Sequence, residues 1–115
     1  MDSVPETRRF IAEVEEVHSG DDLVLMVDLG IDNLFKKVRA RLHGVDTPDA
    51  YKLDSDTDAG KIRDRVKEMV KGRSCCIELH AMRRGGWIVT LLVRDKAEYI
   101  NINEVLRELG FVFEG

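Results

Sequence analysis

In three stretches of this chain, apolar residues recur at every second position, and this period constrains the fold more than any other feature. It is clearest in residues 36–43, where Val38, Ala40 and Leu42 alternate with basic side chains. The same period runs through residues 22–29 and 75–82. Because successive side chains of a strand point to opposite faces, each stretch predicts a strand with one face on a core.

Two further strands are expected beside these three. Residues 10–17 precede the turn Ser19-Gly20-Asp21, and the apolar run 87–93 follows Gly85-Gly86. Glycine-containing turns between apolar runs are typical of β-hairpins. We therefore expect one hairpin near the N-terminus and a second in the C-terminal half.

Helical spacing appears in two places. Apolar residues at helical intervals run from Ala59 to Val70, with Thr57 as the N-cap and Gly72 just past the end. A shorter pattern follows Asn101, which with Glu104 resembles a capping box, and stops at Gly110. These signals predict a helix between the third and fourth strands and a short C-terminal helix.

The resulting element order is β-β-β-α-β-β-α, which defines an α+β, mainly β, fold class. This is the order of the OB fold, a five-stranded barrel with a helix between strands 3 and 4 that often binds nucleic acid on one face. At 115 residues, the chain is long enough for one core, and we expect residues 1–115 to form a single domain.

The charge distribution bears on partners. A net charge of −4 counts against tight sequence-independent binding to DNA or RNA, because such binding neutralises phosphates. Basic residues nevertheless gather in residues 36–41, 61–73 and 83–84, whereas acidic residues dominate 13–32 and 46–58. A basic stripe beside an acidic pocket is compatible with this pattern.

Cysteine use and the N-terminus bear on location. Cys75 and Cys76 are adjacent and would point to opposite faces of a strand, which disfavours a disulfide between them. The first six residues lack the basic start and apolar stretch of a signal peptide, and no segment approaches membrane-spanning length. We expect a cytoplasmic monomer that does not associate with membranes.

One segment carries the strongest functional signal. Arg41 ends a predicted strand and stands five residues before Asp46-Thr47-Pro48. Taken alone, Asp46-Thr47-Pro48 is typical of an ordinary Asx turn. Together with Arg41 and the carboxylate of Asp21, which could reach the same end of the sheet, it suits hydrolysis of nucleic acid.

On these motifs the sequence resembles the staphylococcal nuclease (thermonuclease) family over nearly its whole length. The first motif is Val17-His18-Ser19-Gly20-Asp21-Asp22-Leu23-Val24-Leu25, followed by Asp28-Leu29-Gly30. The second, and most diagnostic, is Val38-Arg39-Ala40-Arg41-Leu42-His43-Gly44-Val45-Asp46-Thr47-Pro48-Asp49. The third departs from the family: in Arg84-Gly85-Gly86-Trp87-Ile88-Val89, Gly86 stands where the family has a catalytic arginine.

The resemblance implies a calcium site and a set of catalytic residues. Asp21, Asp46 and the Thr47 carbonyl would hold Ca²⁺, a hard cation that prefers oxygen ligands. Arg41 would stabilise charge on the phosphate, and Asp49 would orient or deprotonate the attacking water. Asp49 is one methylene shorter than the family's glutamate, so we expect reduced turnover.

The missing arginine leaves the second phosphate contact open. Arg84, or Arg83 beside it, could reach in from one turn away, and of the two we expect Arg84 to be catalytic. Loss of one charged donor to the transition state typically costs a factor on the order of 10²–10³.

The expected function is a calcium-dependent nuclease that cleaves single-stranded or unpaired DNA and RNA. The alternative is a catalytically degenerate barrel that binds nucleic acid or protein. His43 lies on the same face as Arg41, but we interpret it as a surface residue. Residues 54–65 resemble an EF-hand loop only in part, because Arg65 replaces the final glutamate, and we expect a solvated loop and helix cap.

Overall fold

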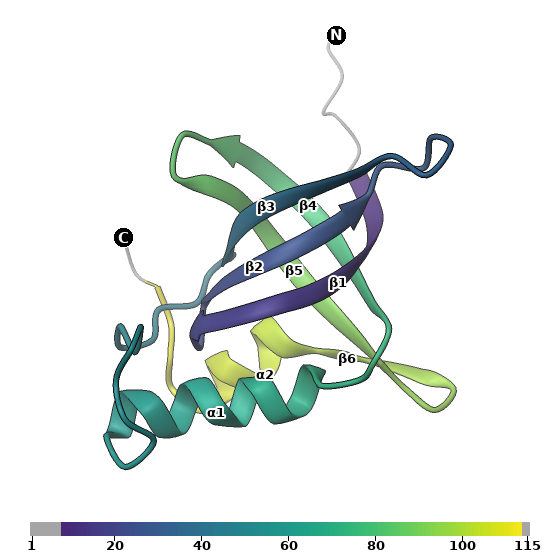
Figure 1. Cartoon of the computed structure of the whole chain (residues 1–115). Helices are drawn as coiled ribbons and strands as arrows, with labels where there is room; N and C mark the ends of the chain where they lie inside the picture. The colour runs from purple at the N-terminus through teal and green to yellow at the C-terminus, as the bar shows by residue number, and fades with distance from the viewer. Residues whose placement is uncertain (1–7, 114–115) are drawn as a thin grey trace, which may run out of the picture.

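Five strands close into a barrel in the computed structural model, which describes residues 8–113 (Figure 1). The strands are β1 (Arg8–Ser19), β2 (Asp22–Asp28), β3 (Phe35–Leu42), β4 (Cys75–Arg83) and β5 (Gly86–Asp95). The helices are α1 (Asp58–Val70) and α2 (Ile102–Glu108), and a short additional strand, β6 (Glu98–Asn101), precedes α2. The expected OB-like α+β class is confirmed.

Strand pairing explains the closure. The sheet runs β3-β2-β1-β4-β5-β6, and β3 also pairs with β5 in parallel, which joins the two sides of the barrel. In that parallel pair Arg41 lies opposite Ile88, and Leu42 lies opposite Val89. β6 was not predicted from the sequence, because four residues are too few to show a period of two.

The core fills the barrel as the alternation predicts. Val38, Ala40 and Leu42 of β3 are buried, whereas the arginines between them, Arg39 and Arg41, are exposed. The inward faces of β2, β4 and β5 contribute further fully buried residues, including Leu23, Leu25, Ile77, Val89 and Leu91. The outward face of β3 is therefore free to carry function.

Both helices lie at one end of the barrel (Figure 1). Thr57 caps α1, since its hydroxyl accepts a hydrogen bond from the Gly60 amide at 3.0 Å. Asn101 caps α2 in the same way, through the Glu104 amide at 3.1 Å. The exposed segment 54–57 is thus a solvated loop and a helix cap, as expected.

A buried asparagine anchors α2 next to the end of β3. Asn103 is 1% exposed and donates from Nδ2 to the carbonyls of His43 and Val89, both at 3.0 Å. Its Oδ1 accepts a hydrogen bond from the Leu91 amide at 2.9 Å. Because every polar atom of this side chain has a partner, the network fixes the backbone at the point where β3 ends.

The cysteines are free thiols, and burial raises the pKa of Cys75 to about 11.

Neither helix within residues 8–113 combines the length and apolar character required to cross a bilayer. The N-terminal residues that suggested a cytoplasmic location lie outside the described residues.

Candidate functional site

Asp21 is the buried centre of the candidate site. It lies in the turn between β1 and β2 and is only 3% exposed. Its Oδ1 accepts a hydrogen bond from the Thr47 hydroxyl at 2.8 Å, and that hydroxyl accepts one from the Asp21 amide at 3.1 Å. This reciprocal pair ties the loop after β3 to the β1–β2 turn and brings two of the predicted residues together.

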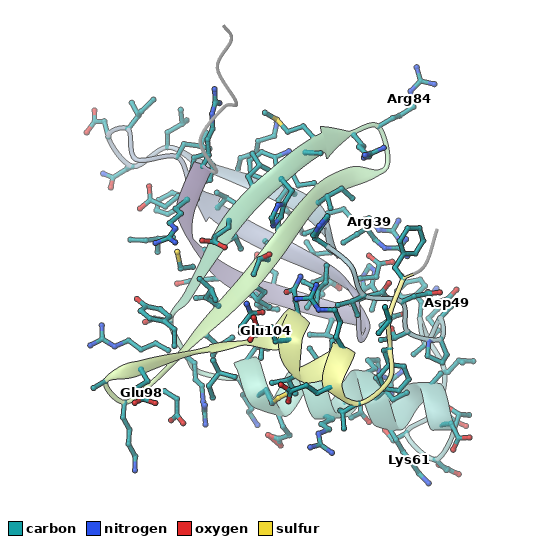
Figure 2. The ribbon with its side chains drawn as sticks, turned by 180° about the vertical axis from the view of Figure 1, so that it is seen from behind. Arg39, Asp49, Lys61, Arg84, Glu98 and Glu104 are labelled. Carbon is teal, nitrogen blue, oxygen red and sulfur yellow. The ribbon has the colours of Figure 1, made fainter. Side chains whose placement is uncertain are left out.

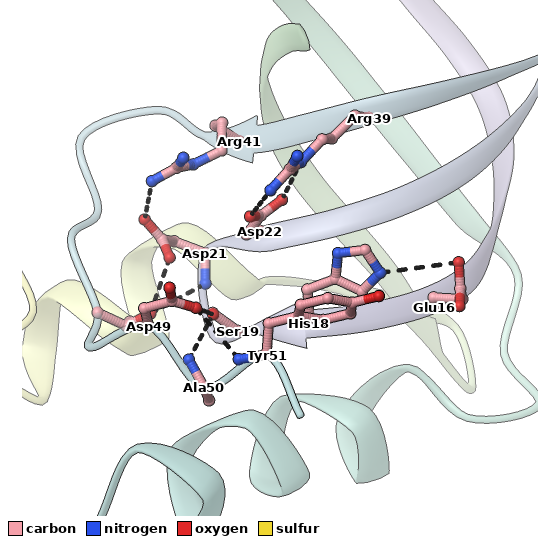
Figure 3. Close-up of polar contacts among 11 residues, drawn as sticks. Glu16, His18, Ser19, Asp21, Asp22, Arg39, Arg41, Asp49, Ala50 and Tyr51 are labelled. Carbon is pink, nitrogen blue, oxygen red and sulfur yellow. Dashed lines mark hydrogen bonds and ion pairs between the residues drawn. The ribbon is translucent and has the colours of Figure 1, made fainter. Parts of the chain in front are cut away.

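Arg41 reaches the same carboxylate from the outward face of β3. Its Nη2 lies 3.3 Å from Asp21 Oδ2, and its side chain is 49% exposed (Figure 3). A single, long contact with a half-exposed arginine contributes little stability. Arg41 can therefore turn toward a phosphate at small cost, while Asp21 keeps its hydrogen bond from the Thr47 hydroxyl.

These groups open onto a pocket of about 430 Å³. Besides Asp21 and Arg41, its lining includes Asp46, which is exposed, and Arg83 at the end of β4. Three of the six predicted site residues thus line one cavity, with a second guanidinium facing it. Thr47 does not line the cavity, but its hydroxyl positions Asp21.

The other two predicted residues lie elsewhere. Asp49 Oδ1 accepts hydrogen bonds from the Ser19 hydroxyl at 3.3 Å and the Tyr51 amide at 3.1 Å, so its carboxylate holds its own loop (Figure 3). Arg84 lies at the tip of the β4–β5 hairpin and points away from the barrel (Figure 2). Neither lines the pocket, and Arg83 occupies the place expected for Arg84.

Gly86 cannot carry the side chain that the family has at this position. Its φ is +136°, a conformation that side chains rarely adopt, and a Cβ there would lie 2.5 Å from the Arg39 carbonyl oxygen. The close approach belongs to the parallel pairing of β3 with β5, which closes the barrel. The arginine is therefore excluded by backbone packing as well as absent from the sequence.

A second arginine on β3 is engaged by a tighter ion pair. Arg39 donates from Nε and Nη2 to the two carboxylate oxygens of Asp22, at 3.0 Å and 2.6 Å (Figure 3). The hydrogen bond and charge of Asp22 raise the pKa of Arg39. This bidentate pair neutralises Asp22, which stands next to Asp21, so the extra carboxylate adds little negative charge near the pocket.

The donors around the pocket fit a hard cation. Asp21 uses one lone pair on each carboxylate oxygen, and a carboxylate offers about four acceptor sites, so two remain. Asp46, which also lines the pocket, supplies further carboxylate oxygens of the kind that Ca²⁺ prefers. Within residues 8–113 no group of three or more His, Cys, Asp or Glu side chains is placed to hold a metal.

His43, which the sequence placed on the same face as Arg41, lines the pocket, and so does Phe113, which was not predicted from the sequence. Phe113 is held there because its amide donates to the Gly44 carbonyl at 3.2 Å and its neighbour Val112 bridges to Val45. The run of β-favouring residues Phe111, Val112 and Phe113 after Gly110 could have indicated an extended segment. It could not have shown which loop that segment pairs with.

No protein-family model matches this chain, and no curated protein matches its sequence. The resemblance to the thermonuclease family therefore rests on the motifs, and the confirmed barrel agrees with it.

Proposed function

We propose that this protein is a calcium-dependent phosphodiesterase that hydrolyses single-stranded DNA or RNA in the pocket at the end of β3. One observation carries the proposal. A buried aspartate, an exposed aspartate and two arginines, drawn from four separate segments of the chain, line the same cavity. Two guanidinium groups beside two carboxylates match the needs of a bound metal and a phosphodiester.

The arginines bind and stabilise the phosphate in this proposal. Arg41 releases its 3.3 Å contact with Asp21 and turns its planar guanidinium to two phosphate oxygens. Arg83 approaches from β4 and supplies the second positive group. Both arginines interact more strongly with the phosphate as negative charge grows on its oxygens during attack. Interactions that are stronger in the transition state than in the ground state are the ones that accelerate the reaction.

The carboxylates hold the cation. Asp21, Asp46 and the Thr47 carbonyl would bind Ca²⁺, which would polarise the phosphodiester and favour ionisation of a water molecule. The Thr47 hydroxyl donates to Oδ1 of Asp21 and holds this side chain in place. Oδ2 is then left to exchange Arg41 for the cation.

Asp49 makes the proposed enzyme slow. Its carboxylate lies outside the pocket, where Oδ1 is held by the Ser19 hydroxyl and the Tyr51 amide, so it can orient water in the pocket only if loop 49–51 moves. The same observation favours a second candidate function, a barrel that binds single-stranded nucleic acid without cleaving it. We place either activity in the cytoplasm and assign it to a monomer.

The test is digestion of labelled single-stranded DNA and RNA with calcium or with chelator. Wild type is compared with Asp46→Ala and with Asp54→Ala, an exposed aspartate of the loop before α1 that does not line the pocket. Calcium-dependent cleavage that is lost in Asp46→Ala and kept in Asp54→Ala supports the enzyme. Binding without cleavage supports the second candidate, and folded wild type that neither binds nor cleaves contradicts both.

A further inference from the structure

A pair of stacked histidines lies beside the pocket. The rings of His43 and His80 have centroids 4.4 Å apart and planes inclined by 19°. His43 directly follows β3 and His80 belongs to β4, so the two rings meet across β5. Both residues are exposed.

A β-bulge directs His80 toward this position. Leu79 pairs with Val89 and Ala81 with Ile88, which leaves His80 as the extra residue of β4. Bulges re-aim side chains and are common next to functional sites. Thr90 of β5 then fixes the ring, because its hydroxyl and His80 Nε2 are hydrogen-bonded at 2.7 Å.

His43 is fixed through its backbone. Its amide donates to the Val89 carbonyl at 2.8 Å, and its carbonyl accepts a hydrogen bond from Asn103 at 3.0 Å. The backbone of His43 and the ring of His80 are therefore held by separate networks. Such preorganisation lowers the entropy that a ligand would otherwise lose on binding.

The stack is continuous with the proposed phosphate site, since His43 lines the pocket together with Arg41 and Arg83. A nucleotide whose phosphate contacts these arginines would bring a base next to the imidazole rings. Stacking on a ring needs an unpaired base, because the faces of paired bases are covered within a duplex.

Resting on the proposed function, we propose that the His43–His80 stack is a binding site for one unpaired nucleobase, adjacent to the phosphate pocket, and that it selects single strands over duplexes. Burial, and secondarily the charge of His43, lower the pKa of His80, which favours its neutral form at pH 7. A neutral ring contributes by stacking and does not act as a phosphate-binding cation.

The stack could instead serve only to hold β3, β4 and β5 together. The two roles differ in one respect: a base-binding stack requires a base in the ligand, whereas a structural stack affects all ligands alike. The third histidine, His18, provides a control, because it also packs against an aromatic ring, Tyr51, with centroids 4.3 Å apart and planes inclined by 43°, but does not line this pocket.

The experiment measures dissociation constants by fluorescence anisotropy in chelator, with a short labelled single strand and with the same strand carrying abasic sites. His43→Ala and His80→Ala are expected to weaken binding of the intact strand about 5- to 150-fold, the range for loss of one base stack, and of the abasic strand less than about twofold. His43→Phe and His80→Phe keep affinity for the intact strand, because they restore an aromatic face without a charge. His18→Ala changes neither constant.

Equal weakening of both strands overturns the inference, as does failure of both phenylalanine variants to bind the intact strand. Calcium-dependent cleavage by wild type distinguishes failure of the base-binding site from failure of the proposed function. If wild type cleaves and the alanine variants bind both strands normally, the inference fails alone. If wild type binds neither strand in chelator and also cleaves neither strand with calcium, the proposed function fails with it. Base-dependent loss of binding without any cleavage supports the stack and contradicts the hydrolase.

Discussion

Gly86 offers a test of whether backbone packing excludes a side chain at this position. Replacing Gly86 with alanine places a Cβ 2.5 Å from the Arg39 carbonyl oxygen, at a φ of +136°. Backbone in a region that strongly favours glycine costs about 1–3 kcal/mol, and a forced contact in a packed site costs a similar amount. We expect a loss of about 2–4 kcal/mol in the free energy of unfolding, or roughly 8–16 °C in melting temperature for a domain of this size.

The neighbouring glycine is the control. A Cβ at Gly85 meets nothing within 4 Å, and its φ lies outside the positive range, so Gly85→Ala should change stability by less than about 0.5 kcal/mol. Urea unfolding followed by fluorescence of Trp87, the single tryptophan, reports both variants next to the site of change. Equal midpoints for Gly86→Ala and Gly85→Ala would refute the packing argument.

The same reasoning predicts that Gly86→Arg does not restore activity. The variant should unfold at lower urea concentration and cleave no faster than wild type, because the new side chain must displace β3 from β5. Cleavage accelerated about tenfold or more in a stable Gly86→Arg variant would show that β3 and β5 move apart easily next to Arg39.

Three further predictions concern single side chains. Arg83→Ala should lower the cleavage rate at least about 10²-fold, whereas the rate of Arg84→Ala should stay within about threefold of wild type. Both are measured as initial rates at saturating calcium, and equal losses would contradict the placement of the two side chains. Asn103→Ala should cost about 3 kcal/mol or more in thermal unfolding, because three hydrogen bonds to the backbone disappear at a buried site, and a smaller loss would show that water replaces them. Burial and His43 lower the pKa of His80 in the folded state, so the unfolded chain binds more protons. The free energy of unfolding should therefore fall as pH drops below about 6.5 toward that lowered pKa. His80→Phe should remove this part of the acid sensitivity in urea titrations from about pH 7.5 to 5, and an unchanged pH profile would contradict the prediction.

The barrel was predictable because its strands carry their pattern in long stretches. Eight residues of β3 with a period of two determine which side chains face the core, and the result places Arg41 on the outside. The helix caps at Thr57 and Asn101 were equally local signals. β6 escaped prediction because its four residues contain too short a pattern.

Arg83 lines the pocket in place of the expected Arg84 because of the β-bulge at His80. An unbroken alternation from Cys75 would place residues 81 and 83 on the inner face. After the bulge, Ala81 pairs with Ile88, which itself lies opposite Arg41. Paired residues share a face of the sheet, so Arg83, two residues further along β4, joins Arg41 on the outer face. A bulge leaves no reliable trace in one sequence.

Asp49 shows a different limit of motif reasoning. The resemblance implied that Asp49 orients or deprotonates the attacking water, but Ser19 and the Tyr51 amide engage its carboxylate outside the pocket. Ser19 also accepts a hydrogen bond from the Ala50 amide at 2.8 Å, so the contact belongs to a network that spans two loops. Such networks depend on how distant segments meet, which spacing within one motif does not determine.

The most direct test of the central claim is the rate at which Arg41→Ala cleaves labelled single-stranded DNA and RNA at saturating calcium, compared with wild type. We expect calcium-dependent cleavage by wild type and a fall of about 10²-fold or more in the variant. Circular dichroism and the urea midpoint should stay nearly unchanged, because the ion pair of Arg41 with Asp21, at 3.3 Å, is weak. Cleavage by Arg41→Ala within about threefold of wild type, or no cleavage by folded wild type, would contradict the assignment of this pocket as a phosphodiesterase site.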